Sequence, residues 1–248
     1  MKRKTAVALV VGAVALAGCV YQPEAHKNEA SVRKAFKLYE TFSEIEVEGP
    51  VQVVYTKGET DSIVMEGDPA ILYWVDINNG KELRESIIRV EGSTLKMDFS
   101  ANGQDAMRID MKRHWHPVVR ISSPTLHSVV CMDRARFTTT DTIAGETVSC
   151  IVLREGRITT PKLSGKRVEL TATGEGMMNI KEIESEELRV SGYDACKISA
   201  DKTEAKKAEL TGAGHAHVRV GWITPSDAEV SREEIGMAEV KYRVEEDD

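Results

Sequence analysis

Hydrophobic and small residues recur along residues 128–247 with a period of about 20 residues. One expected inward column consists of Val130, Cys150, Leu170, Val190, Leu210 and Val230. A second column, two residues earlier, consists of Val148, Val168, Leu188, Ala208 and Ala228. Two more columns follow, at Gly156, Gly176, Cys196, Ala216 and Gly236, and at Ile158, Met178, Ile198, Val218 and Ala238. A short fixed period of this kind is typical of a solenoid, whose repeats stack on one another.

We therefore predict an all-β fold. It is a right-handed parallel β-solenoid, single-stranded and β-helix-like, with rungs of about 20 residues over 128–248. Glycines are expected at the sharp turns between strands, because glycine adopts a positive φ without strain. An antiparallel β-sandwich with evenly spaced strands is the alternative fold.

The first half of the domain, residues 42–127, is expected to be an irregular β-rich segment. Its short apolar runs are separated by Gly, Pro and Asp, which is the usual punctuation of strands and turns. These runs cover 42–47, 51–55, 63–65, 87–90, 95–99, 109–111 and 118–121. Asp68 as N-cap, followed by Pro69, predicts one short helix over 69–75.

The N-terminus has the pattern of an export signal over residues 1–18. A basic start and a short apolar stretch precede the sequence Leu16-Ala17-Gly18-Cys19. The apolar run is shorter than the roughly 20 residues that a membrane-spanning helix needs. Leu-Ala-Gly-Cys resembles the bacterial lipobox, which implies that Cys19 is lipidated and becomes the mature N-terminus. An ordinary signal peptide that ends near a cysteine is the alternative.

Residues 19–41 are polar and are expected to form a lipid-anchored tether, with a helical turn near 31–39. Val20 follows the cysteine, so the Asp that retains enteric lipoproteins at the inner membrane is missing. We therefore expect an exported protein anchored in the outer membrane, on either its periplasmic or its surface face. The membrane is then one partner, through the acyl chains on Cys19.

The charge balance excludes one class of partner. The chain has a formal net charge of −7, and the sequence pattern contains no basic stripe. Nucleic-acid binding normally needs such a stripe, so we predict no nucleic-acid partner.

Aromatic residues make up only 5% of the chain, which fits thin stacked rungs better than a large core.

Several segments in fixed order resemble one known family. They are FSEIEVEGPVQVVYTKGE at 42–59, STLKM at 93–97, VVRISSPTLHSVV at 118–130, and the glycine turns at 173–176, 191–194 and 211–214. Together, over about 42–240, they resemble the putative auto-transporter adhesin, head GIN domain family of Bacteroidetes lipoproteins. The resemblance implies surface adhesion and brings no catalytic residue. Two turns, at 131–134 and 152–155, depart from the glycine pattern.

Two His-x-His pairs are the candidate metal ligands: His114 with His116, and His215 with His217. Residues i and i+2 of a strand share a face, so each pair offers two imidazoles to Zn²⁺. A zinc site needs a third or fourth ligand, which the sequence does not supply. We therefore predict no metal and no cofactor, and we expect His215 and His217 to face solvent.

Cys131, Cys150 and Cys196 remain after lipidation. Export permits disulfides, but Cys131 is one residue out of phase with Cys150 and is expected to face the other way. This arrangement favours small buried side chains over bridges, and it leaves the pairing open. A catalytic thiol would need a histidine partner, and His127 is the only one near in sequence.

Exposed aromatic residues are the main functional lead: Trp115, Tyr193 and Trp222 are predicted to face a ligand. For Trp222, the alternative is that its ring only caps the core. We interpret the chain as a non-catalytic envelope lipoprotein that binds an extracellular glycan or protein at the cell surface. A structural envelope component without a dissociable ligand is the alternative. A carbohydrate-active β-helix enzyme is the third hypothesis, resting on the charged turn residues Asp133, Arg134, Arg154, Glu155, Glu175 and Asp194.

Overall fold

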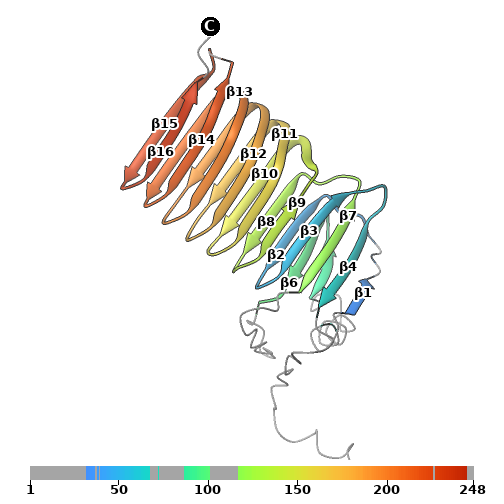
Figure 1. The fold of residues 1–248 in the computed structure, drawn as a ribbon. Helices are drawn as coiled ribbons and strands as arrows, with labels where there is room; N and C mark the ends of the chain where they lie inside the picture. Colours follow the sequence, from blue (N-terminus) through green and yellow to red (C-terminus); the bar gives the residue numbers. More distant parts are fainter. Residues whose placement is uncertain are drawn as a thin grey trace, which may run out of the picture.

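The computed structural model of the chain describes residues 32–36, 38, 40–67, 72, 87–100, 117–225 and 227–244. In these ranges, sixteen strands join into one sheet that winds into a solenoid (Figure 1). No described helix is long and apolar enough to cross a membrane. The predicted β-solenoid, with an irregular β-rich N-terminal part, is confirmed.

Some predicted features lie outside the described residues. These are the signal peptide 1–18, Cys19, residues 20–31 of the tether, the strand at 109–111, the segment with His114, Trp115 and His116, and the helix at 69–75 apart from Leu72, which is buried. The strands expected at 42–47, 51–55, 63–65, 87–90, 95–99 and 118–121 overlap the observed strands β2 to β7.

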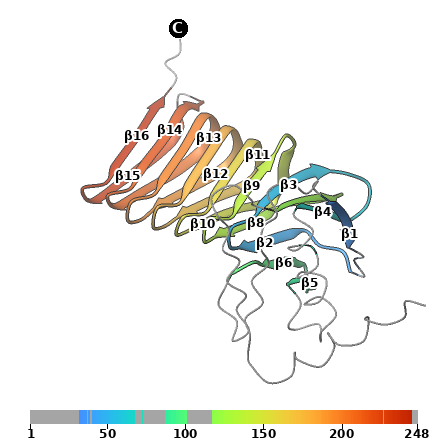
Figure 2. The same cartoon turned by 60° about the horizontal axis from the view of Figure 1, so that its bottom comes forward.

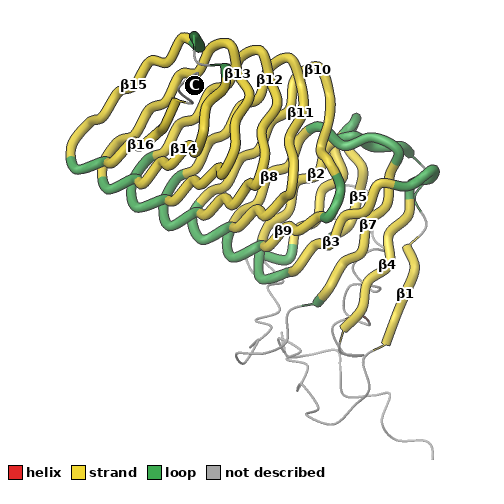
Figure 3. Tube along the Cα trace, turned by 45° about the horizontal axis from the view of Figure 1, so that its top comes forward, coloured by secondary structure: helices red, strands yellow, loops and turns green. Residues whose placement is uncertain are grey.

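The regular part of the solenoid consists of long parallel strands. They are β10 (Thr142–Leu153), β11 (Arg157–Ala172), β12 (Met177–Gly192), β13 (Lys197–Gly214) and β14 (His217–Thr224). From β10 to β14 each residue pairs with the residue 20 positions further on, for example Leu170 with Val190. The pairing between β11 and β12 skips Pro161 and Lys166, so the rung has corners there. Figure 3 shows the turns stacked along one edge.

The core consists of the inward side chains of these strands. Cys150, Leu170, Val190 and Leu210 form one buried column, as predicted. The column of Ile143, Leu163, Ile183, Thr203 and Ile223 is buried as well. Thr203 is its polar member, and its Oγ1 has no hydrogen-bond partner among the described residues.

The predicted register is wrong in the first rung. β8 (Ser128–Met132) pairs with β10 at an offset of 21, so Val129, and not Val130, stacks on Cys150. The offset returns to 20 at Thr142, because one extra residue lies between Thr138 and Thr142. That corner is held by Asp141, whose Oδ2 accepts a hydrogen bond of 2.9 Å from the backbone N–H of Lys57.

The predicted register is also wrong in the last rung. β15 (Glu229–Gly236) pairs with β13 at an offset of 22, so Val230 stacks on Ala208 and Arg232 stacks on Leu210. β16 (Glu239–Val244) pairs with β14 at an offset of 22 up to Lys241 and of 21 from Arg243. The two extra residues lie between Thr224 and Glu229, in a segment that contains the cis Thr224–Pro225 bond.

Charged side chains close the C-terminal end of the solenoid. Arg232 and Glu234 occupy positions that are apolar or glycine in the earlier rungs. Arg232 Nη1 donates a hydrogen bond of 3.2 Å to the backbone oxygen of Val240, and Glu234 Oε1 accepts one of 2.6 Å from the Val240 N–H. The end of the core is therefore polar.

The N-terminal strands enter the stack out of sequence order. β2 (Glu44–Glu48) pairs in parallel with β8 on one side and with β6 (Thr94–Asp98) on the other. β3 (Gln52–Lys57) likewise lies between β9 (Arg136–Thr139) and β7 (Val118–Ser123). Residues 44–57 thus form a rung between two segments that follow them in sequence. Strands on the two sides of residue 128 belong to one continuous sheet (Figure 2).

Antiparallel strands finish this end of the molecule. β4 (Ser62–Gly67) pairs with β7, β1 (Val32–Phe36) pairs with β4, and β5 (Ile88–Glu91) pairs with β6. The helical turn predicted near residues 31–39 is wrong, since β1 is extended there. Pairing with the free edge of β4 stabilises the strand, and Phe36 packs against the core.

Candidate functional site

Trp222 lies on the outer face of β14, next to the C-terminal end of the solenoid. Its strand neighbours are Lys202 on β13 and Arg243 on β16. The side chain is 48% exposed, and the guanidinium carbon Cζ of Arg243 lies 5.5 Å from the ring centroid. This cation–π contact holds the indole at the surface, so Trp222 does not cap the core.

Two open cavities meet at this tryptophan. One has a volume of about 850 Å³ and includes His217, Arg219 and Lys241 in its lining. The other has a volume of about 960 Å³ and extends over Glu182, Glu204 and Thr224. Lys202, Trp222 and Arg243 line both cavities. We call the two cavities together the Trp222 groove.

A β-bulge shapes the groove. Arg219 pairs with Lys241 and Trp222 pairs with Arg243, so two residues of β14 lie opposite one residue of β16. Bulges redirect side chains and increase the local twist of a strand. Gly221, within the bulge, approaches the β13 backbone so closely that a Cβ atom would lie 1.8 Å from the carbonyl oxygen of Asp201.

The 850 Å³ half of the groove is basic. Its lining contains five basic side chains and two carboxylates: Lys202, Arg219, Arg232, Lys241 and Arg243 against Asp201 and Glu239. The sequence pattern showed no basic stripe, yet the fold gathers these cations from four strands. Lys241 and, to a smaller degree, His217 hold the pKa of Glu239 below its usual range, which keeps that carboxylate charged.

The structure places the second pair of predicted histidines in solvent. His215 and His217 are both exposed, as expected for side chains that alternate with the buried Ala216 and Val218. His217 Nδ1 lies 3.3 Å from Glu239 Oε2. Among the described residues, no group of three or more His, Cys, Asp or Glu side chains could hold a metal ion.

Tyr193 lies apart from Trp222. It is 40% exposed and belongs to the turn between β12 and β13, on the edge where the rungs reverse direction. Its backbone N–H donates a hydrogen bond of 2.9 Å to the carbonyl of Ala172, which fixes the turn. The structure therefore does not combine Tyr193 and Trp222 in one patch.

The cysteine predictions have a mixed outcome. All three described cysteines are free and buried, as expected. The prediction that Cys131 faces away from the core is wrong, because the offset of 21 pairs it with the inward Val152. Burial raises the pKa of Cys150 to about 12 and raises that of Cys131 as well, so neither thiol is an activated nucleophile.

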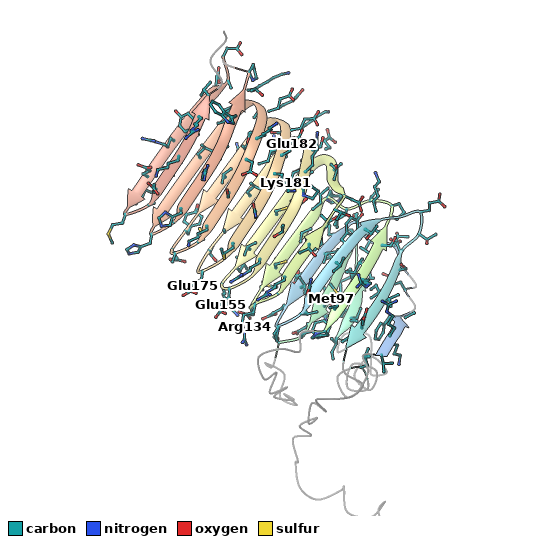
Figure 4. All side chains as sticks on the ribbon, viewed as in Figure 1. Met97, Arg134, Glu155, Glu175, Lys181 and Glu182 are labelled. Carbon is teal, nitrogen blue, oxygen red and sulfur yellow. The ribbon has the colours of Figure 1, made fainter. Side chains whose placement is uncertain are left out.

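The turn edge carries a column of residues with positive φ, although not all of them are glycine. Asp133, Arg154 and Asp194 adopt φ values of 49°, 59° and 63° at positions where other rungs use glycine. Those glycines are Gly49, Gly174, Gly214 and Gly236. Figure 4 shows Arg134, Glu155 and Glu175 at successive turns along this edge, pointing outward.

One carboxyl at this edge has an unusual pKa. Burial, together with a hydrogen bond to Asp133, raises the pKa of Glu48 to about 7. Burial alone would raise the pKa of Asp133, but hydrogen bonds from Arg154 and Glu48 outweigh it, and the pKa is lowered. Arg154 forms an ion pair with Asp133 and lies 4.0 Å from Glu48. Glu48 was not among the predicted site residues, because its contact with Asp133 depends on β2 pairing with β8.

The family of the chain follows from comparison with known proteins. Residues 41–233 match the family described as putative auto-transporter adhesin, head GIN domain, and the chain belongs to this family. No protein with a curated description matches the chain.

Solved structures share the fold. A putative adhesin from Parabacteroides distasonis ATCC 8503 is 13% identical, with a TM-score of 0.63 over 87% of this chain and 93% of that chain. A putative lipid binding protein from the same organism is 14% identical, with a TM-score of 0.62 over 87% and 98%. A putative adhesin from Bacteroides fragilis NCTC 9343 is 14% identical, with a TM-score of 0.56 over 87% and 98%.

Proposed function

We propose that this chain is a non-catalytic envelope lipoprotein whose solenoid binds an extracellular partner through the Trp222 groove. The observation that carries the proposal is the exposed indole of Trp222, which lies between two open cavities. Aromatic side chains that are held rigid at a surface supply much of the contact energy in binding sites. Membership of an adhesin family supports a role at the cell surface.

The lipid anchor is part of the same proposal. Cys19 would carry the acyl chains, and residues 20–31 would hold the solenoid away from the outer membrane. Metabolic labelling with an alkyne fatty acid tests the anchor, because the label should appear on the wild-type protein and be lost in Cys19→Ala. Equal labelling of the two proteins would contradict the anchor without affecting the groove.

A pair of single variants tests the groove. The chain from Val20 keeps every described strand, since these lie between Val32 and Val244. Immobilised glycans and extracellular host proteins are probed with the wild type, Trp222→Ala and Tyr193→Ala. Both tyrosine and tryptophan are exposed, but only Trp222 lines the groove.

We expect ligands of the wild type to lose at least about tenfold in affinity for Trp222→Ala, as is typical when a central aromatic contact is removed. Tyr193→Ala should bind like the wild type. If only Tyr193→Ala loses affinity for the ligand, the binding site lies at the turn edge and not in the Trp222 groove. No bound glycan or protein at all would favour a structural envelope component instead.

A further inference from the structure

Three cations of the Trp222 groove differ from the cations that form ion pairs along the regular rungs. On those rungs, several basic residues pair with carboxylates of a neighbouring rung. Examples are Lys162 with Glu182 at 2.9 Å, Arg167 with Glu187 at 3.0 Å and Arg189 with Glu209 at 3.1 Å. Such pairs neutralise the outer face of the sheet.

Lys202, Arg219 and Arg243 have no ion pair with any carboxylate in the described part of the chain. Arg243 instead stacks on Trp222, and Lys202 has Glu182 and Trp222 as its strand neighbours. Arg219 pairs in register with Lys241, so two cations stand side by side on adjacent strands. Glu239 forms an ion pair with Lys241 and offsets part of their mutual repulsion. Arg219 has no carboxylate partner within the described ranges, and a bound anion would supply one.

The groove has the shape of an open trough. Its residues come from β12, β13, β14, β15 and β16, and neighbouring strands of a sheet are spaced about 4.8 Å apart. A trough of this kind can contact several units of a linear polymer. An acyl chain would require an enclosed apolar slot, whereas the groove is open and its rim carries Lys202, Arg219 and Lys241.

We infer that the ligand of the Trp222 groove is an acidic polysaccharide, a sugar chain that carries carboxylate or sulfate groups. Its anionic groups bind Lys202, Arg219 and Lys241, and its sugar rings contact the indole of Trp222. The inference rests on the proposed function and adds the chemical class of the ligand. A chain with a net charge of −7 can still attract an anion there, since the half of the groove with a volume of about 850 Å³ has a positive local charge.

The test compares a charged polymer with its neutral form. Polygalacturonate and fully methyl-esterified polygalacturonate share one backbone and differ in charge. Calorimetric titration of the chain from Val20 measures binding of each polymer to the wild type, to Arg219→Gln/Lys241→Gln and to Arg189→Gln/Lys207→Gln. Both double variants change the net charge equally, but Arg189 and Lys207 contact Glu209 outside the groove.

We expect the wild type to bind polygalacturonate at least about tenfold more tightly than the esterified polymer, because charge-assisted hydrogen bonds are lost with the charge. Arg219→Gln/Lys241→Gln should lose a similar factor, and Arg189→Gln/Lys207→Gln should bind like the wild type. Equal loss in both double variants would show long-range attraction only and would overturn the inference.

Three other results would also overturn it. Equal, Trp222-dependent binding of the esterified polymer would make the ligand a neutral glycan, and the proposed function would stand. Binding to phosphatidylglycerol vesicles, without binding to polygalacturonate, would make the groove a membrane contact. If neither polygalacturonate nor dextran sulfate binds, the ligand is not an acidic polysaccharide. The comparison of wild type and Trp222→Ala on immobilised glycans and proteins would still decide whether the groove binds another ligand.

Discussion

A Cβ atom on Gly221 would lie 1.8 Å from the carbonyl oxygen of Asp201, directly beneath the Trp222 groove. Backbone atoms cannot move aside as a flexible side chain can, so any larger residue at 221 must displace the β13–β14 ladder. The absence of a side chain at this corner allows the last rungs to stack as closely as they do.

Gly221→Ala should therefore lower the free energy of unfolding by about 3 kcal/mol or more, the range expected for severe steric overlap. Gly67→Ala is the matched control, because among the described residues its Cβ would meet only Pro117, at 3.6 Å. The control should stay within about 0.5 kcal/mol of the wild type. Urea unfolding followed by circular dichroism measures both. Equal stability of the two variants would show that the backbone near Gly221 can move to accommodate a Cβ atom.

Arg232 keeps the C-terminal end of the core polar. Arg232→Leu would continue the column of Leu170, Val190 and Leu210 to the open end of the solenoid, and an exposed apolar end favours self-association. Light scattering should report a larger mass for this variant than for the wild type at the same concentration. Arg189→Leu, on a sheet face, should leave the mass unchanged. A wild-type mass for Arg232→Leu would mean that other charges block the end.

Glu48 should make stability depend on pH. Its pKa is raised from 4.5 to about 7, so the folded state holds the proton more tightly than the unfolded state. The stabilisation is complete below about pH 4.5 and is lost as the pH rises towards 7. Glutamine at position 48 stays neutral at every pH, so Glu48→Gln does not lose stability as the pH rises. The variant should be more stable than the wild type at pH 8, by on the order of 1 to 3 kcal/mol.

Thermal unfolding at pH 5 and pH 8 tests this expectation. The gain of Glu48→Gln over the wild type should shrink or reverse at pH 5, where the wild-type carboxyl is protonated. Glu175→Gln, at an exposed turn, is the control for a general charge effect. A gain of the same size at both pH values would contradict the raised pKa of Glu48.

The three internal cysteines should be inert in the folded protein. Cys131, Cys150 and Cys196 are free and buried, and burial raises the pKa of each thiol. A thiol reagent should modify none of them in native buffer at neutral pH and all three in denaturant. Rapid modification of the native chain, or fewer than three thiols after unfolding, would contradict the packing described.

Sequence periodicity was sufficient to predict the regular rungs. Cys150, Leu170, Val190 and Leu210 are inward because twenty residues separate each from the next and nothing interrupts the count. Inserted residues changed the phase at both ends. One extra residue before Thr142 turned Cys131 inward, and two between Thr224 and Glu229 moved Val230 out of its predicted column.

The candidate site could be predicted only in part. Trp222 was expected to be exposed, but a strict period of 20 would place Tyr242 beside it. The 22-residue offset and the β-bulge place Arg243 there instead. The position of β2 between β6 and β8 could not be predicted either. Tertiary packing determines it, and strand pairing over long distances leaves no periodic signal in the sequence. For that reason the contact of Glu48 with Asp133 could not be predicted.

The most direct test of the central claim is the NMR signal of the Trp222 indole N–H during titration with polygalacturonate. The chain contains three tryptophans, so the Trp222 signal is the one missing from the spectrum of Trp222→Phe. We predict that this signal shifts and saturates with the polymer concentration, and that methyl-esterified polymer leaves it in place. An unchanged Trp222 signal under conditions where the polymer binds would contradict the assignment of the groove as the binding site.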